Sequence, residues 1–286
     1  MTDAALALPD PASVLADARR ALAEDFGSGD VTADLLPAES SAQARVIARE
    51  AAVICGRPWF DACFRQLDPV ARIEWRVGEG GRIDADGIVC ELHGNARALV
   101  GAERSALNFL QTLSGTATVA AQYADAVRST RAAILDTRKT LPGLRYAQKY
   151  AVRCGGASNH RIGLFDAILI KENHIAAAGS LAAAVRAARA RHPDLLLEVE
   201  VENFGELDAA LAAGVDRIML DEFSLDDIRR AVAHVAGRVK LEVSGSVSLD
   251  RVRALAETGV DYISVGALTK HVRAIDFSMR VSMTER

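Results

Sequence analysis

The stretch LLLEVEVENFGELDAALAAGVDRIML, residues 195–220, decides the fold. It begins with an apolar run of strand length, continues with apolar residues at helical spacing, and ends with a second short apolar run. Gly214 lies where the helix is expected to stop, because glycine readily adopts the left-handed conformation that ends helices. A strand, a helix and a strand in this order connect parallel neighbours by a right-handed crossover. The stretch therefore predicts one unit of a parallel α/β sheet.

The same alternation runs through the second half of the chain from about Ala133. Ser180, Ser224 and Ser248 lie where helix N-caps are expected, and Gly259 lies at another expected helix end. Six such units without a GxGxxG motif favour a barrel over a dinucleotide-binding sheet, although periodicity alone does not exclude the sheet. The predicted strands are 132–136, 166–170, 195–201, 216–220, 239–243 and 261–265.

The first half of the chain has a different pattern. Short β-like runs alternate with Gly-rich turns, which is typical of a separate small domain. A helical pattern begins near Gly101 and leads into the barrel, so that Arg104 would lie in its first turn. The helix dipole disfavours a cation there, unless the cation serves a ligand or another subunit. We predict an incomplete (β/α) TIM-like barrel over 116–272, and a smaller N-terminal α+β domain of open-sandwich type over 1–115, joined by the C-terminal tail 273–286.

The bulk composition excludes several classes of protein. The chain has 286 residues, of which 50% are hydrophobic, and this is enough for a large core. No apolar run reaches the ~18 residues that a membrane helix needs, and the N-terminus lacks the basic region of a signal peptide. A cytoplasmic protein is therefore expected. The four cysteines contain no CxxC pair, so buried, reduced thiols are favoured over a zinc or disulfide framework: Cys55, Cys63, Cys90 and Cys154.

Charge is distributed unevenly along the chain. The segment Asp136–His174 carries seven lysines and arginines, although the net charge of the whole protein is −4. A basic segment in an acidic protein indicates binding of a small anion and not of nucleic acid. The segment Asp194–Asp227 has eleven acidic residues and one basic residue, Arg217. Together the two segments predict a site for a phosphorylated substrate that also binds metal.

Polar residues follow the predicted strands at the end where βα barrels build their active sites. Glu198, Glu200 and Glu202 alternate along one strand, so they point to the same side. A network with lysines and arginines of the barrel and a functional role are equally plausible for Glu198 and Glu202. His160 and His174 stand among cations, which favours hydrogen bonding over metal binding. The other polar strand ends are Arg138-Lys139, Lys171-Glu172, Asp221, Ser244-Gly245-Ser246 and Gly266.

Glycines after the last two predicted strands suggest a phosphate site. SGS (244–246) and VGA (265–267) fall on consecutive βα loops, where such sites commonly lie in barrels of this kind. The alternative is two tight turns that need glycine.

Distinctive motifs run along nearly the whole chain. They are EDFGSGDVT (24–32), ERSALNFLQTLSG (103–115), DTRKTLPGLRYAQKYAVRCGG (136–156), NHRIGLFDAILIKENH (159–174), EVEVEN (198–203), MLDEF (219–223), EVSGS (242–246) and YISVGALT (262–269). With these motifs the chain closely resembles the quinolinate phosphoribosyltransferase family. Ser158 and Lys270-His271 depart from the usual family pattern, but no predicted site residue is affected.

The resemblance implies a reaction and roles for individual residues. Quinolinate and phosphoribosyl pyrophosphate would give nicotinate mononucleotide, pyrophosphate and carbon dioxide in de novo NAD biosynthesis. The catalytic residues would be Lys139 at the leaving pyrophosphate, with Glu200 and Asp221 holding Mg²⁺ and the ribose hydroxyls. No organic cofactor is implied. Substrate would be bound by Arg104, Thr137, Arg138, His160, Arg161, Lys171, Ser244, Gly245, Ser246, Val265, Gly266 and Ala267.

The resemblance also implies a homodimer with a shared active site, which Arg104 of one subunit completes in the other. It implies no nucleic-acid or membrane partner and leaves assembly beyond a dimer open. Two alternatives remain. A ModD-like protein of molybdenum-transport operons shares the architecture and would use a different phosphoribose acceptor. A catalytically silent anion-binding protein would not need Glu200 and Asp221 beside Lys139.

Overall fold

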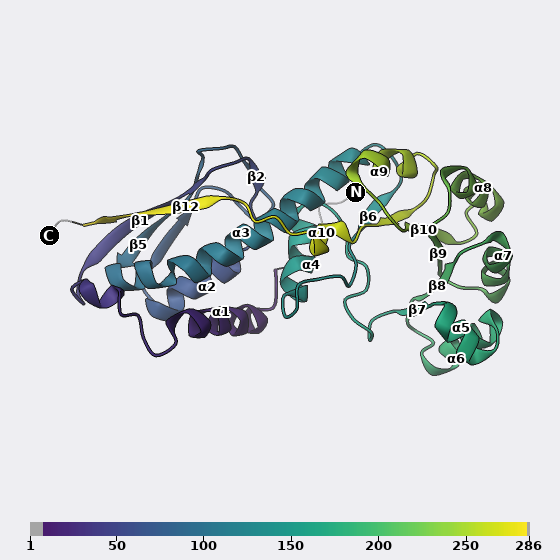
Figure 1. Ribbon diagram of the computed structural model, residues 1–286, viewed down its shortest axis with the longest axis horizontal. Helices are drawn as coiled ribbons and strands as arrows, with labels where there is room; N and C mark the ends of the chain where they lie inside the picture. The colour runs from purple at the N-terminus through teal and green to yellow at the C-terminus, as the bar shows by residue number, and fades with distance from the viewer. Residues whose placement is uncertain (1–7, 285–286) are drawn as a thin grey trace. The chain divides into compact units, whose positions relative to one another are not determined.

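The computed structural model describes residues 8–284 as two compact units (Figure 1). The first unit comprises the described residues up to Ala121, Tyr146–Gly156 and the described residues from Val272 on. The second comprises Gln122–Arg145 and Ala157–His271. The segment Tyr146–Gly156, which the sequence division at 115/116 assigns to the barrel, is thus part of the first unit. The outer ends of the predicted N-terminal domain and tail, 1–7 and 285–286, lie outside the described residues.

The first unit is built on a four-stranded antiparallel sheet in the order β12-β1-β5-β3. Alternate residues of β1 are buried, as expected for a sheet with one covered face. The C-terminal strand β12 pairs with β1 along its length, from Ala42↔Met283 to Ala48↔Phe277. The elements are α1 (Pro11–Phe26), η1 (Ala33–Leu35), β1 (Ser41–Ala48), β2 (Ala52–Val53), α2 (Arg57–Leu67), β3 (Arg72–Trp75), β4 (Arg82–Ile83), β5 (Ile88–Asn95), α3 (Ala96–Ala126), α4 (Arg145–Cys154) and β12 (Phe277–Met283).

Helix α3 begins earlier than the sequence pattern predicts. It starts at Ala96, directly after β5, and the Asn95 side chain accepts a hydrogen bond from the Ala98 N–H at 3.2 Å. Gly101 lies inside the helix, where a Cβ atom would come within 2.9 Å of the Phe26 ring. The glycine therefore permits close packing and does not mark a helix start. Arg104 is consequently well inside the helix, and the predicted unfavourable interaction with the helix dipole does not apply.

The second unit is an α/β unit with six parallel strands in the order β6-β11-β10-β9-β8-β7. All six predicted strands are confirmed. Strands β6 and β7 lie at the two edges, so the sheet is an incomplete barrel. Helices α6, α7 and α8 lie outside the strands (Figure 1). The elements are β6 (Ala133–Leu135), β7 (Ile168–Ile170), α5 (Glu172–Ala178), α6 (Leu181–Arg191), β8 (Leu197–Val201), α7 (Phe204–Ala213), β9 (Arg217–Asp221), α8 (Leu225–Val235), β10 (Lys240–Ser244), α9 (Leu249–Ala256), β11 (Tyr262–Ser264) and α10 (Ala267–Lys270).

The predicted helix ends of this unit are mostly confirmed. Ser180 and Ser224 cap α6 and α8 through their side chains, and Gly214 ends α7 in the left-handed conformation. Ser248 occupies the N-cap of α9 but makes no side-chain capping bond. Gly259 does not end α9 directly, because the helix stops at Ala256 and the glycine follows with φ of 94°. Within the described part of the chain, no helix is both long and apolar enough to cross a membrane.

Candidate active site

A cavity of about 340 Å³ opens among the strand ends of the second unit. Pockets for small molecules in proteins typically have volumes of ~300–1,000 Å³. Most of its lining residues were predicted from the sequence, whereas Leu169, Met219 and Ser264 were not. The lining residues are Thr137, Arg138, Lys139, His160, Arg161, Leu169, Lys171, Glu200, Met219, Ser244 and Ser264.

Two arginines make one side of the cavity strongly cationic. Burial, and then the positive charge of Arg138, lower the pKa of the Arg161 guanidinium. The Nε atom of Arg138 is buried and has no hydrogen-bond partner among the described residues. Two neighbouring guanidinium groups and an unused buried donor disfavour an empty site and favour a bound anion. The arrangement can therefore hold a carboxylate or a phosphate.

Arg145 fixes the loop that carries the basic residues. Its guanidinium donates to the Thr140 hydroxyl at 3.1 Å, the Ile162 carbonyl at 3.3 Å and the Arg138 carbonyl at 3.4 Å. Arg145 thereby joins the loop after β6 to the loop before β7. Arg145 is one of the seven lysines and arginines of the basic segment, and only its contacts reveal the positioning role.

The Lys139 backbone is also held in place. Its N–H donates to the Thr137 hydroxyl at 3.1 Å, and its carbonyl accepts from the Thr269 hydroxyl at 2.8 Å. A Cβ atom on Gly266 would lie 3.2 Å from Cδ of Lys139. The glycine after β11 thus leaves room for the lysine side chain.

Lys171 and Glu200 form an ion pair across the cavity, with Nζ and Oε2 2.5 Å apart. The Glu200 side chain is 9% exposed and that of Lys171 is 42% exposed, so the cation can reach solvent or a ligand while the carboxylate stays buried. His174 accepts a hydrogen bond from the Lys171 N–H through Nδ1, at the start of α5. The predicted hydrogen-bonding role of His174 is therefore confirmed.

His160 is enclosed by protein groups on both ring nitrogens. Nδ1 accepts from the Arg161 N–H at 2.7 Å, which requires Nδ1 to be unprotonated. Nε2 lies 2.9 Å from Glu198 and 3.5 Å from Glu242, although the Glu198 contact is too bent for a regular hydrogen bond. Asp136, at the end of β6, accepts from the His160 N–H at 2.8 Å. These contacts position His160 on its loop, where it lines the cavity, and its substrate-binding role stays a prediction.

Glu198 and Glu242 form a buried carboxylate pair beneath the cavity. Burial raises the pKa of Glu198 to about 7, against the charge of Arg217. Burial, and then the charge of Glu198, raise the pKa of Glu242 to about 7. Arg217 binds Glu242 at 2.9 Å and stacks over the Tyr262 ring at 4.2 Å. The ion pair of Arg217 is thus with Glu242, whereas Glu198 contacts His160, so both interpretations of Glu198 stay open.

Glu202 is separated from this network. It is exposed and follows the end of β8, where its N–H donates to Glu206 at 2.9 Å. The sequence analysis missed Glu242 and Asp136. Each is a single acidic residue within or at the end of an apolar strand. Burial of such a carboxylate is costly without partners, and this pattern could have indicated a buried polar network.

The remaining predicted residues surround the cavity without lining it. Asp221 ends β9 and lies in register with Ser244 on β10. Gly245 has φ of 100°, and a Cβ atom there would meet the Glu222 carboxylate at 2.7 Å. The Val265 N–H donates to the Leu135 carbonyl at 2.9 Å, and the phosphate cradle stays a prediction. Ser246, Gly266 and Ala267 continue from the same strand ends.

Arg104 belongs to the first unit, where its side chain is exposed on α3. Within a single chain, Arg104 is not among the residues that line the cavity, and its role in a partner subunit stays a prediction.

Comparisons with known proteins match this chain along most of its length. It is 45% identical to the nicotinate-nucleotide pyrophosphorylase [carboxylating] of Mycobacterium leprae over 271 residues, which cover 91% of this chain and 94% of that protein. It is 39% identical to the probable nicotinate-nucleotide pyrophosphorylase [carboxylating] of Bacillus subtilis, with 91% of each chain covered. The solved nicotinate-nucleotide pyrophosphorylase of Francisella tularensis superposes with a TM-score of 0.94 at 46% identity, covering 97% of this chain and 99% of that one.

Two family models match in succession. The model of the quinolinate phosphoribosyl transferase N-terminal domain matches residues 30–114, and the model of the C-terminal domain matches residues 116–280. The second match alone spans more than half of the chain and contains the whole cavity. The chain therefore belongs to the quinolinate phosphoribosyl transferase family.

Proposed function

We propose that this chain catalyses decarboxylating transfer of phosphoribose from phosphoribosyl pyrophosphate to quinolinate, giving nicotinate mononucleotide, pyrophosphate and carbon dioxide. The observation that carries the proposal is the cavity itself. It joins a cationic side, with Arg138 and Arg161, to the Lys171–Glu200 ion pair at the strand ends. The names of the relatives, which are nicotinate-nucleotide pyrophosphorylases, agree with this chemistry. The reaction belongs to de novo NAD biosynthesis, and we expect it in the cytoplasm.

The cationic side supplies the recognition of quinolinate. A planar guanidinium donates two parallel hydrogen bonds to a carboxylate, and Arg138 and Arg161 are close enough to influence each other's charge. Lys171 would exchange part of its contact with Glu200 for the second carboxylate. A dicarboxylate neutralises this cluster better than a monocarboxylate, which leaves a cation without a partner.

The chemistry needs positioning and electrostatics from the protein. The pyridine nitrogen attacks the anomeric carbon while pyrophosphate leaves, and the ribose carries positive charge in the transition state. Carboxylates such as Glu200 stabilise that charge, and Lys139 stabilises the leaving group. The bond between the ring and its neighbouring carboxylate then breaks, and carbon dioxide leaves. The electron pair stays on the ring carbon, stabilised by the positive ring nitrogen, until that carbon takes a proton from solvent. No organic cofactor is needed for either step.

The donor set fits Mg²⁺. Glu200 and Asp221 end neighbouring strands and offer hard carboxylate oxygens, and Mg²⁺ commonly binds through one or two carboxylates together with waters and substrate phosphates. These two residues would hold the ion, which would neutralise the pyrophosphate when bound. A homodimer in which Arg104 reaches the partner's site completes the proposal.

The proposal is tested with purified protein, phosphoribosyl pyrophosphate and Mg²⁺, with quinolinate or nicotinate as acceptor. We expect nicotinate mononucleotide and one carbon dioxide per turnover from quinolinate, little turnover of nicotinate, and loss of activity with a chelator. Arg161→Ala should lose quinolinate turnover, whereas Arg229→Ala, at an exposed site on α8, serves as the control. Equal turnover of nicotinate, or no product from quinolinate, would reject the assignment.

A further inference from the structure

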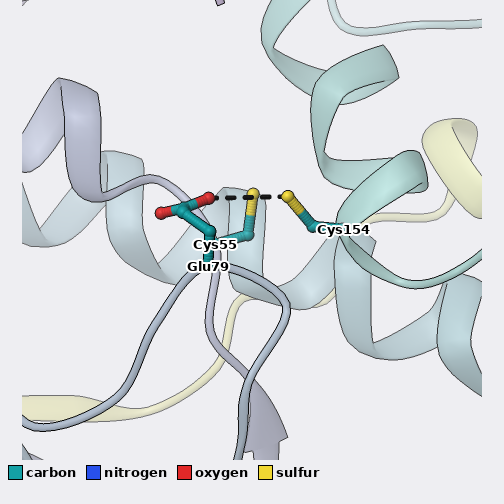
Figure 2. A group of neighbouring side chains, drawn as sticks. All are labelled: Cys55, Glu79 and Cys154. Carbon is teal, nitrogen blue, oxygen red and sulfur yellow. Dashed lines mark hydrogen bonds between the residues drawn. The ribbon is translucent and has the colours of Figure 1, made fainter. Parts of the chain in front are cut away.

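Three side chains from distant parts of the sequence converge in the first unit, outside the candidate active site (Figure 2). They are Cys55, just before α2, Glu79 in the turn between β3 and β4, and Cys154 at the end of α4. One ligand atom of each lies within 4.8 Å of the other two. The Cys154 thiol donates to Oε2 of Glu79 at 3.5 Å. The sequence offers no CxxC signal for this cluster, because three separate elements assemble it.

The cluster is held in position by backbone groups. Oε1 of Glu79 accepts from the Arg57 N–H at 2.7 Å and from the Gly56 N–H at 3.1 Å, at the start of α2. Oε2 accepts a longer bond from the same Gly56 N–H, at 3.3 Å, and is the oxygen that the Cys154 thiol contacts. The Cys55 N–H donates to the Ser114 hydroxyl at 3.0 Å, and the same hydroxyl donates to the Cys55 carbonyl at 3.1 Å. The Glu79 carboxylate and the Cys55 backbone are therefore held in position before any ligand binds.

The turn around Glu79 is also packed tightly against α4. A Cβ atom on Gly80 would lie only 2.9 Å from the Cys154 carbonyl oxygen, so only glycine fits there without displacing the helix end. Cys154 is 8% exposed and Cys55 is fully buried. Glu79 is partly buried.

The hydroxyl oxygen of Tyr150 is a fourth potential ligand, beside two sulfurs and a carboxylate oxygen. Its side chain is 2% exposed, and its hydroxyl is buried without a hydrogen bond of regular geometry. Tyr150 lies one helical turn before Cys154 on α4, so both side chains project from the same face of the helix. A buried hydroxyl without a regular partner, beside two thiols and a carboxylate, leaves one more donor directed at the same place.

Two thiols beside a carboxylate offer a cation a mixed set of sulfur and oxygen ligands. Thiolate ligands select Zn²⁺-like ions over Mg²⁺, which prefers oxygen alone.

We propose that Cys55, Cys154 and Glu79 form a binding site for one thiophilic divalent cation of the Zn²⁺ type, with the Tyr150 hydroxyl beside its fourth position. Zn²⁺ binds tetrahedrally to cysteine sulfur and carboxylate oxygen. Binding replaces the two S–H bonds with two metal–sulfur bonds and releases the two protons to solvent. The ion connects the end of α4 to the loops before α2 and β4, and it is separate from the Mg²⁺ of the proposed reaction.

The test uses the full chain, reduced and freed of metal, titrated with Co²⁺ as a spectroscopic probe and then with Zn²⁺. We expect one equivalent of Co²⁺ to produce sulfur-to-metal charge-transfer absorption, Zn²⁺ to abolish it, and about two protons to be released per ion. Cys55→Ser and Cys154→Ser should lose the band. Glu79→Gln should weaken binding by at least roughly tenfold. Cys63→Ser and Cys90→Ser are the matched controls, because these cysteines are also buried but lie outside the cluster.

A second measurement needs no variant. Zn²⁺ should raise the unfolding temperature of the metal-free wild-type protein, whereas the same concentration of Mg²⁺ should not, because a ligand stabilises the state that binds it. The proposal is overturned if the wild type shows no charge-transfer band. It is equally overturned if the Cys55→Ser and Cys154→Ser proteins keep the band, or if Zn²⁺ leaves the unfolding temperature of the wild type unchanged.

Discussion

At the scale of single residues, the cavity contains two kinds of cation. One kind binds the carboxylates of the substrate, and the other stabilises charge that develops in the transition state. Arg161 donates to the Ala167 carbonyl, lies close enough to Arg138 to feel its charge, and suits a carboxylate that is present throughout the reaction. Lys139 extends from a loop whose backbone is fixed by Thr137 and Thr269, and its side chain passes over Gly266. These surroundings give the two cations different tasks, which kinetics can distinguish.

We therefore expect Lys139→Ala and Arg161→Ala to differ. Loss of Lys139 should lower kcat by 10²-fold or more, roughly, with a small change in quinolinate KM, because its charge matters mostly in the transition state. Loss of Arg161 should raise quinolinate KM and weaken quinolinate binding measured by calorimetry. An equal loss of quinolinate affinity in both variants would place Lys139 in the carboxylate pocket.

Glu242 predicts a pH dependence of stability. Its pKa is about 7 in the folded chain, whereas that of an unfolded glutamate is about 4.3. The folded state therefore holds more protons than the unfolded state between these values. The free energy of unfolding must then fall as pH rises from about 4.5 to about 7, and this contribution is flat above that range.

Replacing Glu242 by glutamine should remove much of this slope. The measurement is the urea midpoint of unfolding at several pH values between 5 and 8, for wild type and Glu242→Gln. Glu257→Gln, at an exposed carboxylate on the surface of the same unit, is the control and should keep the wild-type slope. Parallel curves for wild type and Glu242→Gln would show that Glu242 is ionised throughout.

At the scale of elements, the second unit contains two serine N-caps that look alike in sequence and differ in structure. Ser224 accepts a hydrogen bond from the Asp227 N–H at 3.2 Å and donates to the Asp227 carboxylate at 2.7 Å. Ser248 begins α9 and makes no side-chain capping bond. Both serines are exposed, so a difference in burial does not affect the comparison of their capping energies.

Ser224→Ala should lower the free energy of unfolding by about 1 kcal/mol, the usual cost of removing an N-cap. Ser248→Ala should change it much less, because no capping bond is lost. Urea unfolding of the two variants beside wild type measures both values. If both changes cost the same, the difference in capping geometry has no energetic consequence.

At the scale of the whole molecule, a single chain contains the cavity, but the predicted role of Arg104 requires a second subunit. The residue is exposed on α3 of the first unit, and the family resemblance places its equivalent in a partner subunit's site. We expect a two-fold dimer in which Arg104 of one subunit and Lys139 of the other serve the same site.

Mixed dimers provide the test. Arg104→Ala and Lys139→Ala should each be nearly inactive alone. When the two variants are co-folded in equal amounts, about half of the dimers are mixed, and each mixed dimer has one site with both defects and one with neither. Activity near about a quarter of wild type supports sharing. Absence of recovery, with mixed dimers demonstrated by mass spectrometry, would place Arg104 in its own subunit's site or outside any site.

The sequence by itself determined the repeating strands and helices of the second unit, most of the cavity lining, and the family. Apolar periodicity and helix caps are local signals. Parallel strands place their carboxyl ends at the same edge of the sheet, whatever their separation in the sequence. That is why Lys139, Lys171 and Glu200 could be placed in one site before their contacts were known.

Only the tertiary structure decided the rest, because it depends on groups far apart in the chain. The start of α3 at Ala96 follows from Asn95 and from packing against Gly101, and the engaged ring of His160 follows from Glu198 and Glu242. The thiol cluster of the first unit joins three elements that share no motif. Burial decides the charge of such groups, and burial is a property of the folded chain that no local pattern contains.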